Sequence, residues 1–240
     1  MLKGVLIDWG GVLTTSLHEA IAEWLEADGI DAVHYRDLMR ALVRHAYEDG
    51  APSGNPTHAP GRGENGVSPI HAPERGENGE NPIHALERGE IDVATFERDL
   101  AARLVTRHGA PPVADGLLTR MFAGFRPVQP MYEMLRAARS AGLATCLVSN
   151  SWGNHYTRDG WDHYFDQVVI SGEVGMRKPE PRIFHHALGL VGLLPQECVF
   201  IDDIEANIEA ARALGLIGLH HRDADTTIAA VEALCSLPLR

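Results

Sequence analysis

Lysine, cysteine and long apolar runs are all scarce in this chain of 240 residues. Only Lys3 and Lys178 are lysines, and the formal net charge of -12 argues against a nucleic-acid-binding surface. The three cysteines, of which Cys146 and Cys198 lie inside apolar runs, argue against a disulfide framework. No run approaches the roughly 20 apolar residues of a membrane helix, and the N-terminus reads as a strand rather than a signal peptide. We therefore expect a cytoplasmic protein without a membrane partner, in which local positive charge attracts any anionic substrate.

Short apolar runs alternate with segments of helical periodicity over much of the chain. The runs have strand length and no helical spacing, which predicts buried parallel strands at residues 3–8, 143–149, 167–171, 198–202 and 216–220. Helical spacing is found between them at 130–141, 180–191 and 204–214. This alternation predicts an α/β fold with a doubly wound, Rossmann-like parallel sheet.

The stretch from Leu17 to about Phe125 breaks the alternation, because its apolar residues recur only with helical spacing. It follows the first strand directly, so it predicts an all-helical insertion. We expect a core domain made of residues 1–14 and 128–240 and a helical cap made of residues 15–127. Such a cap would lie over the carboxyl edge of the sheet as a lid.

A tandem repeat of 13 residues lies inside this insertion, with copies at 55–67, 68–80 and 81–93. Glycine and proline make up a third of residues 50–91, which predicts a disordered loop at about 50–90. Only the third copy leads into a helical pattern, so we interpret it as the original structural segment and the other two as duplications. Metal binding by the repeated histidines is an alternative, although His58, His71 and His84 lack close metal-ligand spacing.

Polar residues follow several of the predicted strands at the point where each strand ends. Asp8 closes KGVLID, Ser149 begins SNS, and Asp202 and Asp203 close CVFIDD, while Lys178 lies in GMRKPEP. The carboxyl ends of parallel strands share one edge of a sheet, where ligands bind. Each residue alone could simply cap a turn or a helix. Together they predict a site with a nucleophile, a hydroxyl, a cation and a pair of metal-ligating acids.

Four motifs resemble those of the haloacid dehalogenase superfamily, in its phosphatase-rich branch with a small helical cap after the first strand. They are DWGGVLT, LVSNS, the lysine segment GMRKPEPRIF, and VFIDDIEANIEAARALG. The last two are also similar to the N-terminal phosphatase domain of soluble epoxide hydrolases. The resemblance implies Mg²⁺-dependent hydrolysis of a small phosphorylated substrate, a phosphate monoester, through an aspartyl-phosphate.

The resemblance also implies roles for individual residues. Asp8 would be the nucleophile, and Lys178 would place positive charge beside the phosphoryl oxygens. Ser149 and main-chain N–H groups near Trp9, Gly10 and Asn150 would donate hydrogen bonds to the transferring group.

Mg²⁺ would be bound by the Asp8 carboxylate, the main-chain carbonyl of Gly10 and Asp203, with Asp202 holding a metal-bound water. Asn207, one helical turn after Asp203, is expected to be a structural partner of the acidic loop.

Specificity would come from residues that face the nucleophile. Trp152 is the candidate for the entrance, with packing of the loop against the cap as the equal alternative. Arg36, Arg40 and Arg44 share a helix face and could approach an anionic tail, although such a face is usually solvated. Sugar phosphates, lipid phosphates and phosphorylated natural-product intermediates all remain open, as does the oligomeric state.

Gly10 departs from the family pattern, because typical phosphatases have a second aspartate there that protonates the leaving alcohol. The chain can be a phosphatase that uses another proton donor, such as His18 or a water. It can also be a phosphatase for substrates whose leaving group needs little protonation. A dehalogenase also lacks this aspartate, but Asp202 and Asp203 would put unwanted charge beside its nucleophile. Schiff-base cleavage of a carbon–phosphorus bond is excluded because residues 15–127 contain no lysine. A non-catalytic binding module is the remaining alternative.

Overall fold

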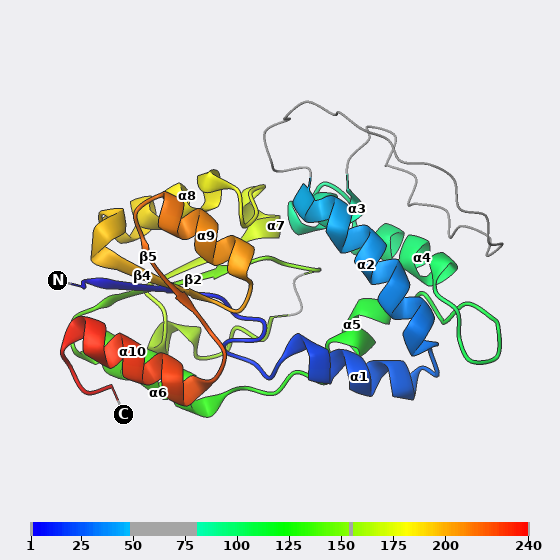
Figure 1. Ribbon diagram of the computed structural model, residues 1–240, viewed down its shortest axis with the longest axis horizontal. Helices are drawn as coiled ribbons and strands as arrows, with labels where there is room; N and C mark the ends of the chain where they lie inside the picture. The colour runs from blue at the N-terminus through cyan, green and yellow to red at the C-terminus, as the bar shows by residue number, and fades with distance from the viewer. Residues whose placement is uncertain (1, 49–80, 154–155, 240) are drawn as a thin grey trace, which may run out of the picture.

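The computed structural model describes residues 2–48, 81–153 and 156–239, with the side chains of 43–48 left out of the description. Its centre is a five-stranded sheet in the order β3-β2-β1-β4-β5, in which all neighbouring strands are parallel (Figure 1). The strands are β1 (Gly4–Ile7), β2 (Ala144–Ser149), β3 (Gln167–Ile170), β4 (Cys198–Asp202) and β5 (Ile217–His220). The predicted fold class is confirmed, and each predicted strand is found within one or two residues of its expected bounds.

Helices cover both faces of the sheet. Figure 1 shows α6 (Gln129–Ser140) and α10 (Ala224–Cys235) on one face and α8 (Pro181–Val191) and α9 (Glu205–Ala213) on the other. Because side chains alternate along a strand, Val5 and Ile7 pack towards α6 and α10, whereas Leu6 packs towards α8 and α9. Helix α10 was not among the predicted helices. The expectation of fully buried strands is wrong for β5, whose residues are all half-buried because it lies at an edge.

A helical insertion connects β1 to β2, as predicted. It contains α1 (Leu17–Ala27), α2 (Ala32–Glu48), α3 (Pro82–Glu87), α4 (Val93–Arg103) and α5 (Leu117–Met121), with a hydrophobic cluster of its own. The two connections to the sheet pair with each other, since Thr14 forms an antiparallel bridge with Pro127. The insertion lies beyond the carboxyl ends of the strands (Figure 1).

The third repeat copy is folded. The Asn81 side chain accepts a hydrogen bond from the backbone N–H of Ile83, which caps α3, and Ile83 and Leu86 are buried in the insertion's core. The predicted loop to about residue 90 therefore extends too far, because the apolar face of 82–87 is anchored by packing. The first two copies, at 55–67 and 68–80, lie entirely outside the described residues.

The remaining elements are short: a 3-10 turn at Trp161–His163, helix α7 at Ser171–Val174 and a 3-10 turn at Pro195–Glu197. The cysteines are buried and free, as expected, and burial raises the pKa of the Cys146 thiol to about 12. Among the described residues, no helix combines the length and the apolar character needed to cross a membrane.

Candidate functional site

Lys178 is the centre of a buried cluster of charges at the carboxyl edge of the sheet. Its side chain is 1% exposed, and its Nζ lies 2.7 Å from Asp8 Oδ1 and 2.7 Å from Asp202 Oδ2. Asp8 directly follows β1 and Asp202 ends β4, and these two strands are paired neighbours. Burial alone would lower the pKa of Lys178, but the two carboxylates raise it above its ordinary value. The lysine therefore stays charged between two acids.

The loop that carries Lys178 is held by the residue after β2. Asn150 Oδ1 accepts a hydrogen bond from the Lys178 backbone N–H at 2.8 Å, and Asn150 Nδ2 donates to the Lys178 carbonyl at 3.0 Å. An amide side chain can make this pair of bonds because it carries both an acceptor and a donor. Asn150 thus fixes the lysine backbone relative to the strand ends.

Asp203 completes a set of three carboxylates. Oxygen atoms of Asp8, Asp202 and Asp203 all lie within 4.8 Å of one another. Burial raises the pKa of Asp8 to about 7, with Lys178 opposing and Asp202 adding to the shift. Burial and the Asp202 charge raise the pKa of Asp203 to about 6. When all four groups are ionised, three negative charges against one positive charge leave a net charge of -2 in a poorly solvated place.

These oxygen donors fit a hard divalent cation, which would balance the remaining charge. Asp202 already accepts hydrogen bonds from Asn207 Nδ2 and from the Ile204 backbone N–H as well as from Lys178. Asn207 Oδ1 is buried, and no partner for it is found in the described part of the chain. A water on a bound cation would satisfy such an oxygen. The expected structural role of Asn207 beside the acidic loop agrees with its bonds to Asp202.

Glycine is needed beside Asp203. Gly11 has a φ of +76°, and a Cβ there would collide with Asp203 Oδ2. The backbone after Asp8 can therefore approach the acidic loop only without a side chain. At Gly10, in contrast, an added Cβ would have nothing within 4 Å. The position of the missing aspartate is open space.

Ser149 is buried at the end of β2, and its Oγ lies 3.0 Å from the hydroxyl of Tyr156. The ring of Tyr156 meets that of Trp9 edge to face, with centroids 4.9 Å apart. Burial raises the pKa of Tyr156 to about 12, so the phenol is protonated at neutral pH. Tyr156 could not be predicted from the sequence, because it belongs to no motif and follows the second motif by several residues.

A cavity of about 690 Å³ lies between the strand ends and the helical insertion. Asp8, Ser149, Lys178 and Asp203 line it from the sheet, and side chains of α1, α2, α3 and α5 line it from the insertion. Asp202 is the one residue predicted for catalysis, phosphate binding or metal binding in the four motifs that is not among the described residues of its wall. Asp202 lies behind Lys178 and is fully buried.

Trp152 contacts both the cavity and the helical insertion. It lines the cavity, and it also packs edge to face against Phe96 of the insertion with ring centroids 5.6 Å apart. Its Nε1 donates a hydrogen bond to Glu87 Oε1 at 3.1 Å. Glu87 is in turn bound by Arg177 Nε, and these two side chains are 8% and 5% exposed. Sequence reasoning missed this buried ion pair; its one signal is that Arg177 directly precedes the motif lysine.

Two earlier hypotheses find no support in the geometry. Arg36 and Arg40 are exposed and are not among the residues that line the cavity, so their contact with an anionic tail stays a prediction. The side chain of Arg44 lies outside the described set. His18 is also exposed and is not among the residues that line the cavity.

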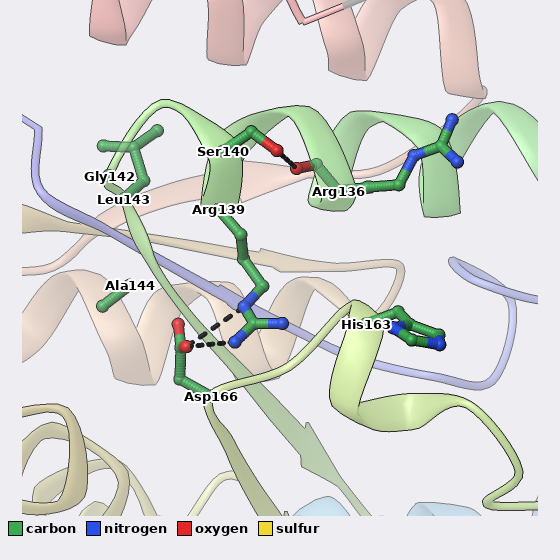
Figure 2. A pocket seen from close by; sticks show the side chains of 8 residues that line it. All are labelled: Arg136, Arg139, Ser140, Gly142, Leu143, Ala144, His163 and Asp166. Atoms are coloured by element: carbon green, nitrogen blue, oxygen red, sulfur yellow. Dashed lines mark hydrogen bonds and ion pairs between the residues drawn. The ribbon is translucent and has the colours of Figure 1, made fainter.

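A second hollow, of about 510 Å³, lies near the opposite edge of the sheet, beside Ala144 and Asp166 at the starts of β2 and β3 (Figure 2). Arg139 Nη2 is paired there with Asp166 Oδ1 at 2.7 Å, and Arg136 points away from that pair. It contains none of the motif residues, so the candidate site remains the cavity at the carboxyl edge.

The sequence of this chain is similar to those of known hydrolases. A family model described as haloacid dehalogenase-like hydrolase matches residues 2–215. Bifunctional epoxide hydrolase 2 of Rattus norvegicus is 32% identical over 112 residues, which cover 43% of this chain and 20% of the rat protein. Phosphoserine phosphatase of Thermus thermophilus is 35% identical over 128 residues, covering 50% of this chain and 51% of that protein. The chain thus spans about half or less of the length of these relatives.

A solved structure shares the fold. It is the HAD family enzyme bt-2542 of Bacteroides thetaiotaomicron in complex with magnesium and inorganic phosphate, with a TM-score of 0.56 and 20% identity. The superposition covers 92% of this chain and 95% of that one. Because the family model covers most of the sequence, including all four motifs, the chain belongs to the haloacid dehalogenase-like hydrolases.

Proposed function

We propose that this hydrolase is a Mg²⁺-dependent phosphatase that cleaves small phosphate monoesters through an aspartyl-phosphate on Asp8. The observation that carries the proposal is the buried cluster in which Lys178 Nζ bridges Asp8 and Asp202 beside Asp203. A carboxylate at the floor of a cavity, held by a fixed cation and next to two further acids, suits attack on a phosphorus atom that is itself negatively charged. The phosphatase among the relatives and the phosphate-bound structural neighbour support the same reaction class.

Asp8 would act in two steps. An Asp8 carboxylate oxygen attacks phosphorus, the phosphorus–oxygen bond to the alcohol breaks, and the alcohol leaves with a proton from solvent. Water then attacks the phosphoryl group, which releases inorganic phosphate and restores the Asp8 carboxylate. Lys178 binds Asp8 Oδ1 and leaves Oδ2 for the attack. Ser149 Oγ and the main chain near Trp9, Gly10 and Asn150 would donate hydrogen bonds to the phosphoryl oxygens.

Asp8, Asp203 and the Gly10 carbonyl would hold Mg²⁺, with Asp202 acting through a water. When bound, the cation neutralises phosphate charge and lowers the repulsion between the substrate and Asp8. The engagement of Asp202 by Lys178, Asn207 and the Ile204 N–H supports the indirect role for this residue.

The helical insertion would be the cap of the active site, with residues 15–127 covering a core of residues 1–14 and 128–240. The cavity has walls from both parts, and Trp152, Glu87 and Arg177 join them beside the lysine loop. A covered site excludes water, which strengthens the interactions of its charges. Gly10 leaves the leaving alcohol without a protein acid, and such an acid typically contributes about 10²–10⁴ in rate.

Gly10 also favours a second candidate, a non-catalytic module that binds phosphorylated molecules. The retained cluster of Asp8, Lys178 and Asp202 argues against it, because buried charges destabilise a fold that does not use them. A dehalogenase is disfavoured by the negative charges of Asp202 and Asp203 beside the nucleophile.

Hydrolysis of p-nitrophenyl phosphate tests the proposal, with the wild type and Asp8→Asn each measured with Mg²⁺ and with a chelator. Turnover should require both Mg²⁺ and Asp8. Asp99→Asn is the matched control, since Asp99 is exposed on α4 and lies outside the cavity, and it should match the wild type. Absence of turnover by the wild type would favour the binding module, and turnover by Asp8→Asn would refute the nucleophile.

A further inference from the structure

The cavity has one charged end and a large apolar remainder. We infer, on the basis of the proposed function, that the substrate is the phosphate monoester of a bulky, mostly apolar alcohol rather than a sugar phosphate or an ester with a charged tail. The cavity of about 690 Å³ is within the range of pockets that enclose a whole small ligand, roughly 300–1,000 Å³, and far exceeds the space needed for a phosphoryl group.

The wall opposite the charged cluster is made of hydrocarbon side chains. It includes Leu17, Ile21, Met39, Ile83, Phe122 and Phe125. These residues come from three helices of the insertion and from the segment around and after α5. Trp9 and Trp152 add aromatic surface near the strand ends, where the ester oxygen would lie. A hydrocarbon group attached to that oxygen would therefore contact apolar surface along its length.

Polar partners for sugar hydroxyls are few in the described part of this wall. The insertion contributes the side chains of Tyr35, Thr119 and Glu87, and Glu87 already accepts hydrogen bonds from Arg177 and Trp152. At the sheet edge, Asn150 is bound to the lysine backbone on both of its amide atoms. A polyhydroxylated alcohol would lose its hydration here without equivalent replacements, which disfavours binding.

A charged tail is equally poorly matched. Among the described residues of the cavity wall, the cations are Lys178 and Arg177. Lys178 is paired with Asp8 and Asp202, and Arg177 with Glu87, so neither has charge to spare for a second anionic group. Arg36 and Arg40 on α2 are exposed and are not among the residues of the cavity wall, and the side chain of Arg44 lies outside the described set.

A homologous series of linear alkyl phosphates tests the inference, from ethyl through butyl, hexyl and octyl phosphate, against a hexose phosphate, all below their micelle concentrations. If each added methylene packs against the apolar wall, kcat/KM should rise by about fourfold per methylene until the alkyl chain fills the cavity. The hexose phosphate should be a poorer substrate than hexyl phosphate by at least roughly tenfold for each hydroxyl left unpaired.

Two variants on α2 supply a matched comparison. Met39→Glu places a charge in the cavity wall, whereas Val33→Glu places the same charge on an exposed part of the same helix. Met39→Glu should flatten the rise of kcat/KM with chain length, because a charge in the wall disfavours the burial of an alkyl chain against it. Val33→Glu should keep the wild-type dependence. If circular dichroism shows that Met39→Glu does not fold, the wild-type series decides.

A flat wild-type series, or preference for the hexose phosphate, would overturn the substrate class while leaving the phosphatase proposal intact. Binding of alkyl phosphonates, followed by the fluorescence of Trp9 and Trp152 in the cavity wall, separates the two ideas further. Absence of all turnover combined with affinity that rises with chain length would refute the phosphatase and support the apolar ligand. Absence of both would refute the two together.

Discussion

Glu87→Gln is expected to destabilise the protein strongly, because it removes the negative partner of a buried cation. Glu87 and Arg177 are 8% and 5% exposed, and the Glu87 carboxylate also accepts the Trp152 indole N–H at 3.1 Å. Breaking a buried ion pair on one side typically costs about 3–5 kcal/mol, since the remaining charge stays buried without compensation. Glutamine can still accept hydrogen bonds, so the free energy of unfolding should fall by about 3 kcal/mol, the lower end of this range.

Thermal and urea unfolding, followed by circular dichroism and by tryptophan fluorescence, would measure this loss. At about 2–4 °C per kcal/mol for a chain of this size, the Tm should fall by roughly 6–12 °C. Glu90→Gln is the matched control: Glu90 is also paired with an arginine, Arg88, but its side chain is 48% exposed. Exposed pairs contribute about 0–1 kcal/mol, so this variant should remain near the wild type.

The double variant Glu87→Gln with Arg177→Met separates the buried charge from a general loss of packing. Removing the cation as well leaves no uncompensated charge, so the double variant should recover much of the stability lost by Glu87→Gln alone. Equal losses for Glu87→Gln and Glu90→Gln, or no recovery in the double variant, would refute the reasoning. Neither result depends on the proposed reaction.

Three further predictions concern the site and the repeat. Gly10→Asp should fold normally, because a Cβ at Gly10 meets nothing within 4 Å. It should raise the rate of hydrolysis of alkyl phosphates more than that of aryl phosphates, because alkyl alcohols are the poorer leaving groups. Equal effects would show that a missing acid does not limit the rate. Deletion of residues 55–80 should leave the Tm and the Mg²⁺-dependent rate nearly unchanged, and a large loss of either would make the duplicated segment part of the lid. The apparent affinity for Mg²⁺, measured by titration, should increase between about pH 5 and pH 8. The pKa values of Asp8 and Asp203 are raised to about 7 and about 6, so protons compete with the cation at the lower pH. An affinity that does not change with pH would contradict this.

The sheet and its charged edge are predictable from the sequence because their signals are local. Each buried strand is a short apolar run, and Asp8, Ser149 and Asp202 occur where such runs end, so topology alone brings them to one edge. The motif lysine follows from the family resemblance, and its buried position between two acids agrees with the role implied for it.

Residues whose roles depend on contacts between the insertion and the sheet could not be predicted in this way. Glu87 and Arg177 are 90 residues apart in the chain, and neither has a neighbour pattern that identifies its partner. Tyr156 reaches Ser149 from a segment without regular structure. The apolar wall of the cavity could not be predicted from the sequence either, because a helix face that lines a cavity has the same periodicity as one that packs in a core.

The third repeat copy connects the insertion to the lysine loop. Its contacts suggest why a duplication that precedes this copy in the chain would leave the lysine loop in place. Glu87 and Arg88, consecutive residues at the end of α3, bind Arg177 and Glu180, which flank Lys178 on both sides. Gly89 packs so closely that a Cβ there would lie 2.7 Å from the Gly172 carbonyl oxygen. These contacts fix α3 against the core from Asn81 onwards.

Added chain before α3 leaves all of these contacts in place, and its cost grows only with the logarithm of loop length, by about 0.6 kcal/mol for each doubling. A change within α3, in contrast, alters the residues that hold the lysine loop. One arrangement of α3 therefore predicts both that the protein tolerates a change of loop length before α3 and that its stability depends on Glu87. The deletion of 55–80 and the Glu87→Gln variant should differ sharply in their effect on the free energy of unfolding.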